Sequence, residues 1–153
     1  MKNGTTLALG LMLAGAMAGN ASAQEIKPDR AIKYRQGVFY AMGWNMYGVL
    51  GPMMKGEIPY NKDQAIKAAS YLHELAFMPY DGFVAGSDQG APTKAKPEIW
   101  KDRAKFDQLA QAMQAETTKL LAAAQSGDQA QFKSAVSATG KACSNCHDDF
   151  RNK

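Results

Sequence analysis

The sequence predicts an all-α protein, an antiparallel four-helix bundle. Apolar residues recur at helical spacing in four separate stretches, and segments rich in Gly and Pro divide these stretches. No stretch shows the alternating pattern of a strand. The first and third connections are short and the second is long, a set of lengths that suits antiparallel neighbours in a bundle.

Residues 1–23 are expected to form a cleavable secretory signal that precedes the bundle. Lys2 is followed by an apolar stretch that ends in Ala21-Ser22-Ala23, which matches the charged, apolar and small-residue regions of such a signal. A retained membrane anchor is the alternative, but the apolar stretch is short for a bilayer span. We therefore expect cleavage after Ala23, a location in the periplasm and a single domain over residues 24–153.

The chain after the signal has only a mild basic excess. Lys2 is the one charged side chain before Ala23, so residues 24–153 carry a formal charge of +3, against +4 for the whole sequence. No long basic run is interleaved with aromatic residues, which argues against nucleic-acid binding. We also expect no membrane association once the signal is cleaved.

The first two predicted helices have clear start and stop signals. The first begins at Pro28, a residue favoured in the first turn of a helix, and stops at Gly51-Pro52. The second begins after Asn61, which with Gln64 resembles a capping box, and ends at Pro79. The apolar positions of the first helix are Ile32, Phe39, Met42, Met46 and Leu50.

A long loop and two further helices follow. Residues 79–96 contain three glycines and two prolines with little periodicity, and a loop of that length usually serves a function. Pro97-Glu98 opens the third helix, which runs until Ser126-Gly127 breaks it. Asp128 and Gln131 form another cap-like pair, and the fourth helix reaches nearly to the C-terminus.

The fourth helix carries the motif with the most specific chemistry. In Cys143-Ser144-Asn145-Cys146-His147, two sulfurs and an imidazole lie at i, i+3 and i+4, so they project from one helix face. This spacing is typical of c-type haem attachment, in which the thiols form thioethers with two vinyl groups and a neutral imidazole binds the iron. We expect one covalently attached haem c per chain, with Cys143 and Cys146 as attachment residues and His147 as the axial iron ligand. The loop at 79–96 is then expected to cover an edge of the haem.

Three other interpretations of the cysteine pair remain open at this stage. A thioredoxin-type redox pair would lie at the start of a helix that follows a strand. Structural zinc would need a fourth protein ligand, for which only His73 is available. A disulfide between Cys143 and Cys146 would suit an oxidising compartment, but its geometry within a regular helix is poor and it leaves His147 without a role.

The position of the motif restricts the class of haem protein. Six residues follow His147 and none is Met, so a sixth iron ligand would come from upstream. With YRQGVFYAM at 34–42, PEIW at 97–100, the C-terminal CSNCHDDFRNK and the four-helix pattern, the chain resembles cytochrome c prime, the class II c-type cytochromes. The resemblance covers essentially all of residues 24–153. It implies a left-twisted bundle with the haem inside one end, commonly in a homodimer packed through the first two helices.

The resemblance also implies a five-coordinate, high-spin iron behind an apolar gate. Low-spin relatives have Met four positions after the arginine of the first helix, and here Phe39 stands at that distance from Arg35. Phenylalanine has no lone pair, so it can cover the iron but cannot bind it. Ligation by Met42, Met46 or His73 is the alternative, and it would make the protein a low-spin electron carrier.

Four more residues match positions near the haem in this family. Arg35 and Gln36 match residues beside the propionates, where a guanidinium offsets carboxylate charge and an amide donates a hydrogen bond. Arg151 matches an arginine beside the proximal face. Trp100 matches an aromatic residue near the haem edge, with core packing in the third helix as the alternative.

These residues lead to two functional hypotheses and argue against a third. The leading hypothesis is a periplasmic haem protein that binds nitric oxide, and carbon monoxide more weakly, behind Phe39. The second is an electron carrier that serves a periplasmic donor or acceptor, and the charge of +3 would permit an acidic partner. A peroxidase would need a distal acid or base, and the pattern around Phe39 offers none, so we predict that the protein is not an enzyme.

Overall fold

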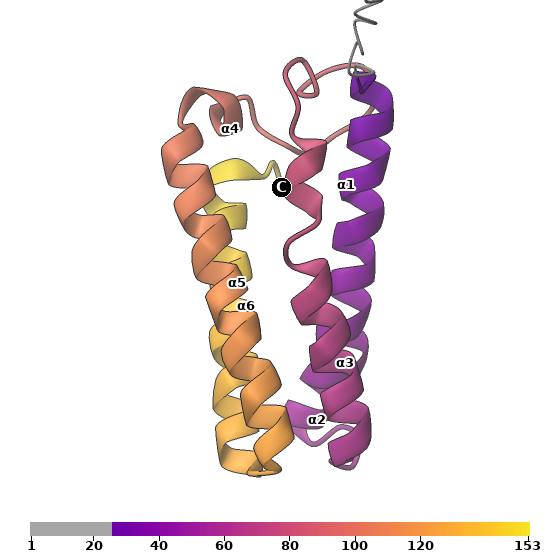
Figure 1. Ribbon diagram of the computed structural model, residues 1–153, viewed down its shortest axis with the longest axis vertical. Coiled ribbons are helices and arrows are strands. Elements are labelled where there is room, and N and C mark those ends of the chain that lie inside the picture. The colour runs from indigo at the N-terminus through magenta and orange to yellow at the C-terminus, as the bar shows by residue number, and fades with distance from the viewer. Residues whose placement is uncertain (1–25) are drawn as a thin grey trace, which may run out of the picture.

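The computed structural model describes residues 26–153 as a bundle of long helices with one irregular end (Figure 1). The signal peptide predicted at residues 1–23 lies outside the described residues. Within residues 26–153 there is no strand, and no helix is both long and apolar enough to cross a membrane. The prediction of an all-α four-helix bundle is confirmed.

The first helix continues past its predicted end. α1 (Pro28–Gly43) runs through a π-helical segment, η1 (Trp44–Leu50), into α2 (Gly51–Lys55). The predicted stop at Gly51-Pro52 is therefore wrong. The wider π turn accommodates the Pro52 ring, which in a regular α-helix would clash with a carbonyl of the preceding turn. The helix ends instead at Gly56, whose φ of 76° is typical of the residue after a helix C-terminus.

The predicted caps of the second and fourth helices are confirmed. α3 is Lys62–Leu75 and α6 is Gln129–Phe150. Asn61 Oδ1 accepts the Gln64 N–H at 2.9 Å. Asp128 Oδ1 accepts the N–H groups of Ala130 and Gln131 at 2.8 and 3.1 Å. Each cap satisfies backbone donors that have no partner inside the helix.

The third predicted helix is interrupted near its start. A short 3-10 turn, η2 (Pro79–Gly82), opens the long loop, which leads to α4 (Glu98–Lys101) and then to α5 (Arg103–Ser126). Asp102 lies between α4 and α5 with φ −120° and ψ 61°, outside the helical region. Its Oδ1 accepts the Lys105 N–H at 3.2 Å, so Asp102 ends one helix and caps the next.

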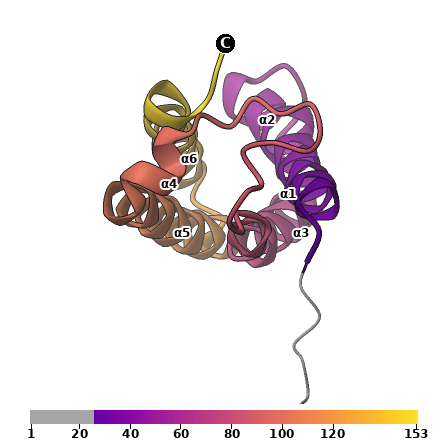
Figure 2. The same ribbon diagram turned by 90° about the horizontal axis from the view of Figure 1, so that it is seen from above.

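The two ends of the bundle differ in how they are filled. α1 and α3 lie on one side and α5 and α6 on the other (Figure 1), and the loop after α3 crosses over the end away from α2 (Figure 2). Near α2 the helices enclose an apolar core that includes Leu50, Ala65, Ala69, Leu72, Leu120, Ala124, Phe132 and Val136. The loop end holds a smaller, mainly aromatic cluster of Phe83, Ile99, Phe106 and Phe150.

Candidate functional site

Two adjoining cavities lie between the helices at the loop end. The larger, which we call the outer cavity, has a volume of about 660 Å³, and the smaller, the inner cavity, has about 100 Å³. The side chains that border both are Phe39, Tyr47, Phe106, Cys146 and His147. A site of this combined size accommodates a cofactor together with a small ligand.

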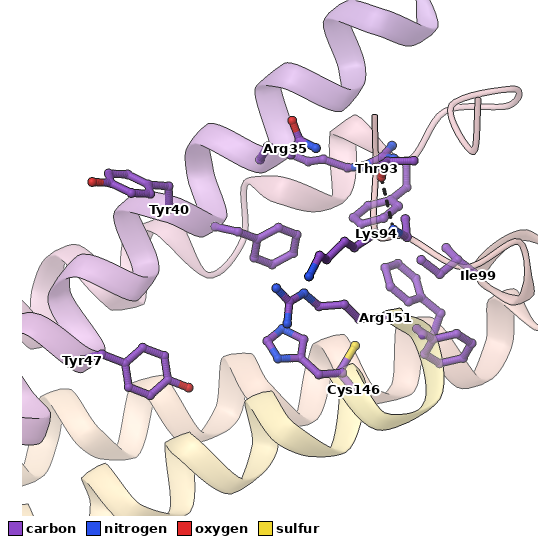
Figure 3. Close-up of a pocket in the computed structure, with 15 residues that line it drawn as sticks. Arg35, Tyr40, Tyr47, Thr93, Lys94, Ile99, Cys146 and Arg151 are labelled. Carbon is purple, nitrogen blue, oxygen red and sulfur yellow. Dashed lines mark hydrogen bonds between the residues drawn. The ribbon is translucent and has the colours of Figure 1, made fainter. Parts of the chain in front are cut away.

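The predicted attachment motif faces these cavities. α6 brings Cys146 to both of them and Cys143 to the inner one, and the Cys146 sulfur points into the outer cavity (Figure 3). Burial raises the pKa of the Cys143 thiol. Burial, with the charges of Cys143 and Asp149, raises the pKa of Cys146 to about 11. A thioredoxin-type pair needs a lowered thiol pKa and a place at a helix start, so the redox interpretation is not supported.

The two histidines of the chain lie in different environments. Burial lowers the pKa of His147 and the Arg151 cation lowers it further, while Asp148 opposes them. His147 is therefore neutral at neutral pH, the form that binds a metal. His73 lies between α3 and α5, with Nδ1 3.4 Å from Thr117 Oγ1, and it borders neither cavity. It is not placed to complete a zinc site, and residues 26–153 contain no cluster of three or more His, Cys, Asp or Glu side chains that could hold a metal ion.

Phe39 and His147 reach the same cavities from different helices. α1 carries Phe39, which is 36% exposed and packs edge-on against Phe83 with 6.3 Å between ring centroids. Met42 and Met46, the other candidates for ligation on this face, are buried and border the inner cavity only. Phe39, at the predicted gate position, thus borders both cavities together with His147, and its side chain is apolar.

Arg35 anchors the long loop rather than pointing freely into the cavity. The side chain is 2% exposed, and its Nη atoms donate to Gly82 O, Ser87 Oγ, Ser87 O and Thr93 Oγ1 at 2.7, 2.7, 2.6 and 3.1 Å. The guanidinium also lies 4.5 Å from the centroid of the Phe83 ring. Burial lowers the pKa of Arg35, with Asp88 opposing, yet a guanidinium stays charged. Within the described chain only its Nε–H is left for a carboxylate in the outer cavity.

Gln36 and Gly82 support the same attachment of loop to helix. Gln36 borders the outer cavity, and its Nε2 donates to Pro92 O at 2.9 Å. A Cβ atom at Gly82 would lie 2.8 Å from Ala31 O, a distance that real Cβ atoms do not adopt. Glycine at this position therefore lets the loop approach α1 closely enough for Arg35 to reach its carbonyls.

Residues 94–96 of the loop pair with residues 150–152 of the C-terminal tail, a contact that we call the loop–tail bridge. Ala95 and Arg151 form an isolated antiparallel bridge, in which Lys96 N–H donates to Phe150 O at 3.0 Å and Asn152 N–H donates to Lys94 O at 2.8 Å. The Lys96 Nζ also donates to two carbonyls of the last turn of α6, each at 3.1 Å. The bridge brings Lys94 and Arg151 to the outer cavity, where both side chains point (Figure 3).

A family model for cytochrome c prime matches residues 30–151, most of the chain. The chain belongs to the cytochrome c prime family. It is 39% identical to the cytochrome c prime of Rubrivivax gelatinosus over 127 residues, which make up 83% of this chain and 98% of that protein. The resemblance drawn from the sequence is confirmed, and the cofactor of the chain is haem c, for whose covalent attachment two cysteines are present.

Solved structures of cytochrome c prime have the same fold. That of the Rubrivivax gelatinosus protein matches with a TM-score of 0.79 over 84% of this chain and 100% of its own. The protein from Shewanella frigidimarina, 38% identical, matches with a TM-score of 0.80 over 84% and 99%. A third match, 37% identical with a TM-score of 0.78 over 85% and 99%, is the nitric oxide complex of a mutant of cytochrome c prime from Alcaligenes xylosoxidans.

The chemistry of the cavity walls fits a haem group. Three cationic side chains, Arg35, Lys94 and Arg151, border the outer cavity, and no Asp or Glu borders either cavity in the described chain. None of the three forms an ion pair within residues 26–153. Two propionates would offset this positive charge, while the aromatic walls suit the apolar ring.

Trp100 is partly buried and packs against the aromatic cluster at the loop end. It borders neither cavity, its Nε1 donates to Val84 O at 3.0 Å, and its ring lies behind Phe83 at 5.9 Å between centroids. These contacts agree with the packing alternative, and a place for Trp100 at the haem edge stays a prediction.

Several residues of the site were not predicted from the sequence. They are Tyr47, Tyr80, Phe83, Thr93, Lys94 and Phe106. The sequence did point to the loop as part of the site, since an irregular segment between two helices of a haem protein can cover the cofactor. No sequence feature pointed to Tyr47, because its position depends on the π-helical turn.

Proposed function

We propose that this chain is a haem protein that binds nitric oxide, and carbon monoxide more weakly, at an iron held by His147 and covered by Phe39. In this proposal Cys143 and Cys146 form the two thioethers. The observation that carries it is that Phe39 and His147, on different helices, border the same two cavities. When bound, the haem would supply an iron that can bind a diatomic gas. Phe39 would restrict access to the iron, and its side chain has no lone pair with which to bind it.

The cationic side chains of the outer cavity would hold the propionate edge of the haem. Lys94 and Arg151 lie on the two segments that the loop–tail bridge joins, so one carboxylate can be shared between them. Arg35 contributes its charge and Nε–H from the other side, while its Nη atoms keep the loop in place. Gln36 supports the loop through Pro92.

Structures of relatives support gas binding. The cytochrome c prime of Alcaligenes xylosoxidans has been solved, as engineered variants, with nitric oxide and with carbon monoxide bound. At 37 to 38% identity over 83 to 85% of this chain, that protein shares the family fold.

The absorption spectrum of the purified holoprotein tests the proposal. We expect a broad, high-spin ferrous spectrum that changes when nitric oxide or carbon monoxide is added. Sharp low-spin bands that neither gas alters would overturn it. Such bands would point to ligation by Met42 or Met46, two of the three methionines of the inner cavity, or by Tyr47. Burial raises the pKa of Tyr47, with the Arg151 cation opposing it, which disfavours the phenolate that ligation needs.

Electron transfer is a second proposed role. The exposed side chains of Lys94 and Arg151 make the mouth of the outer cavity cationic, which favours an acidic redox partner in the periplasm. We propose that the protein does not act as an enzyme. In the described chain no carboxylate and no histidine besides His147 borders either cavity, so a peroxidase would lack its acid or base.

We also propose a periplasmic homodimer, released by signal cleavage after Ala23. In residues 26–153 every exposed large apolar side chain lies between Ile26 and Met78, and none lies on α5 or α6. Tyr40 and Trp44, which are 76% and 65% exposed, are the most exposed of these side chains. Exposed apolar surface of this kind is typical of a protein interface. Sedimentation of the holoprotein tests the dimer, and a monomer at all concentrations would exclude it.

A further inference from the structure

The inner cavity is lined by two tyrosines among side chains that are otherwise largely apolar. Apart from the attachment motif, its lining consists of these tyrosines, Tyr47 and Tyr80, and of apolar side chains. The apolar members are Phe39, Met42, Met46, Leu72, Phe106 and Met113. A cavity of about 100 Å³ is large enough for a diatomic or triatomic ligand.

Tyr47 reaches the cavity because of the π-helical segment. In a regular α-helix Tyr47 would be rotated by about 80° from Phe39 around the helix axis. The extra residue in the wider turn of η1 brings Tyr47 back toward the face of Phe39, so both side chains border both cavities. Asn45 supports this turn, since its Nδ2 donates to Ala41 O at 2.9 Å. In Figure 3 the Tyr47 hydroxyl points toward α6, whereas that of Tyr40 points away from the cavity.

Tyr80 is fixed on another wall of the inner cavity. It lies in η2, directly after the buried Pro79, and its ring stacks on Phe83 at 6.4 Å and meets Phe106 edge-on at 5.7 Å. These contacts hold the ring on two sides. The ring is therefore held in a fixed position, which a ligand site requires.

Neither hydroxyl has a partner in the protein. Tyr34 donates to Met78 O at 3.2 Å, but no hydrogen bond within residues 26–153 involves the hydroxyls of Tyr47 or Tyr80. A phenol is protonated near neutral pH, so each has one O–H to donate. A donor at a cavity wall that has no partner in the protein gains a hydrogen bond when an acceptor enters the cavity.

We propose that Tyr47 and Tyr80 donate hydrogen bonds to a small polar ligand in the inner cavity. They thereby favour a diatomic whose outer atom carries partial negative charge. This inference rests on the proposed gas-binding function and adds a specificity-determining pair to it. Phe39 limits entry by its size, whereas the tyrosines discriminate by charge.

Tyr47→Phe, Tyr80→Phe and the double variant test this proposal in the holoprotein. Each substitution keeps the ring and removes only the hydroxyl. We expect the C–O stretching band of the carbon monoxide complex to move to higher frequency, because a lost donor reduces electron transfer into the ligand. We expect nitric oxide to dissociate about two- to tenfold faster from each single variant, the range for one hydrogen bond.

Tyr60→Phe is the matched control. The Tyr60 hydroxyl is buried and has no partner within residues 26–153, but the ring packs against Phe132 in the core near α2 and borders neither cavity. The proposal is supported if the C–O stretching band and the rate of nitric oxide dissociation are unchanged in this control but shift in the other variants.

Two outcomes overturn the inference. If the C–O stretching band stays constant in Tyr47→Phe, Tyr80→Phe and the double variant while the gas still binds, the tyrosines do not contact the ligand. The proposed gas-binding function then still stands. A wild-type holoprotein that binds neither gas removes both. If Tyr80→Phe does not fold, Tyr47→Phe decides alone, since Tyr47 is 63% exposed and its ring contributes little to packing.

Discussion

At the α2 end of the bundle the helices meet through apolar side chains, whereas at the loop end they surround two cavities and are joined by hydrogen bonds. Phe132 and Leu120, both 0% exposed, represent the closed half. Arg35, with four hydrogen bonds to the loop, represents the open half. Dense apolar packing thus stabilises the half that binds no cofactor. In the half that must leave room for a cofactor, hydrogen bonds to the loop keep the cavity walls in position.

Removing a side chain from the closed half should have the largest effect on stability. We expect Phe132→Ala to lower the free energy of unfolding by about 3–5 kcal/mol, because the site is fully enclosed and a cavity remains. The haem spectrum of the folded protein should not change. Urea unfolding followed by circular dichroism measures the loss, and a value below about 1 kcal/mol would contradict the assignment of Phe132 to the main core.

Arg35→Ala should have the next largest effect, and it should act on the open half. The loss leaves the carbonyl of Ser87 without a donor and that of Gly82 with only the longer hydrogen bond from Ser87 Oγ, which we expect to cost roughly 2 kcal/mol. Limited proteolysis should then cut within residues 83–97. Gln36→Ala is the matched control, since it removes one exposed hydrogen bond to the same loop. Equal cleavage in both variants would show that Arg35 is not the anchor.

Phe39→Ala should separate function from stability. Phe39 is partly exposed, so we expect an unfolding cost of about 1 kcal/mol or less. Carbon monoxide should associate roughly tenfold faster, equivalent to about 1.4 kcal/mol of barrier. Flash photolysis measures this rate, and an unchanged rate would mean that Phe39 does not cover the iron. Phe39→Met provides the complementary test, because it should convert the spectrum toward low spin.

The smallest effect concerns acid stability in the closed half. Hydrogen bonds from the backbone of Gln131 and Ala130 hold the pKa of Asp128 below its ordinary value of 3.8. A carboxyl with a lowered pKa stabilises the folded state above its ordinary pKa, and this contribution is lost as the pH falls through the folded value. Asp128→Asn keeps a capping oxygen but cannot titrate. Below pH 3.8 we expect the Tm of Asp128→Asn to depend less on pH than the Tm of the wild type. Plots of Tm against pH that run parallel for the two proteins would refute this.

The features that could be predicted from the sequence depend on neighbours along the chain. Asn61 and Asp128 cap helices through N–H groups two or three residues away, and the spacing of Cys143, Cys146 and His147 requires only a helix. The prediction that Phe39 covers the iron came from the family resemblance, and in the structure Phe39 borders both cavities.

The features that could not be predicted depend on tertiary contacts. The hydrogen bonds of Arg35 reach a loop whose path has no periodic pattern, so the sequence pointed to propionates and not to Gly82 and Ser87. The π turn that directs Tyr47 has no clear sequence signature. Trp100 packs behind Phe83, and the sequence alone did not decide between that position and the haem edge.

The contacts of Arg35 also have a consequence for the order of folding. They join residues 47 to 58 positions apart, and those between Lys96 and α6 span 52 and 53 positions. In contrast, α5 and α6 are consecutive helices joined by a short turn. Since closing a longer loop costs more entropy, the hairpin of α5 and α6 is expected to form first and the walls of the cavities last. Substitutions in those walls should therefore speed unfolding while leaving the folding rate nearly constant.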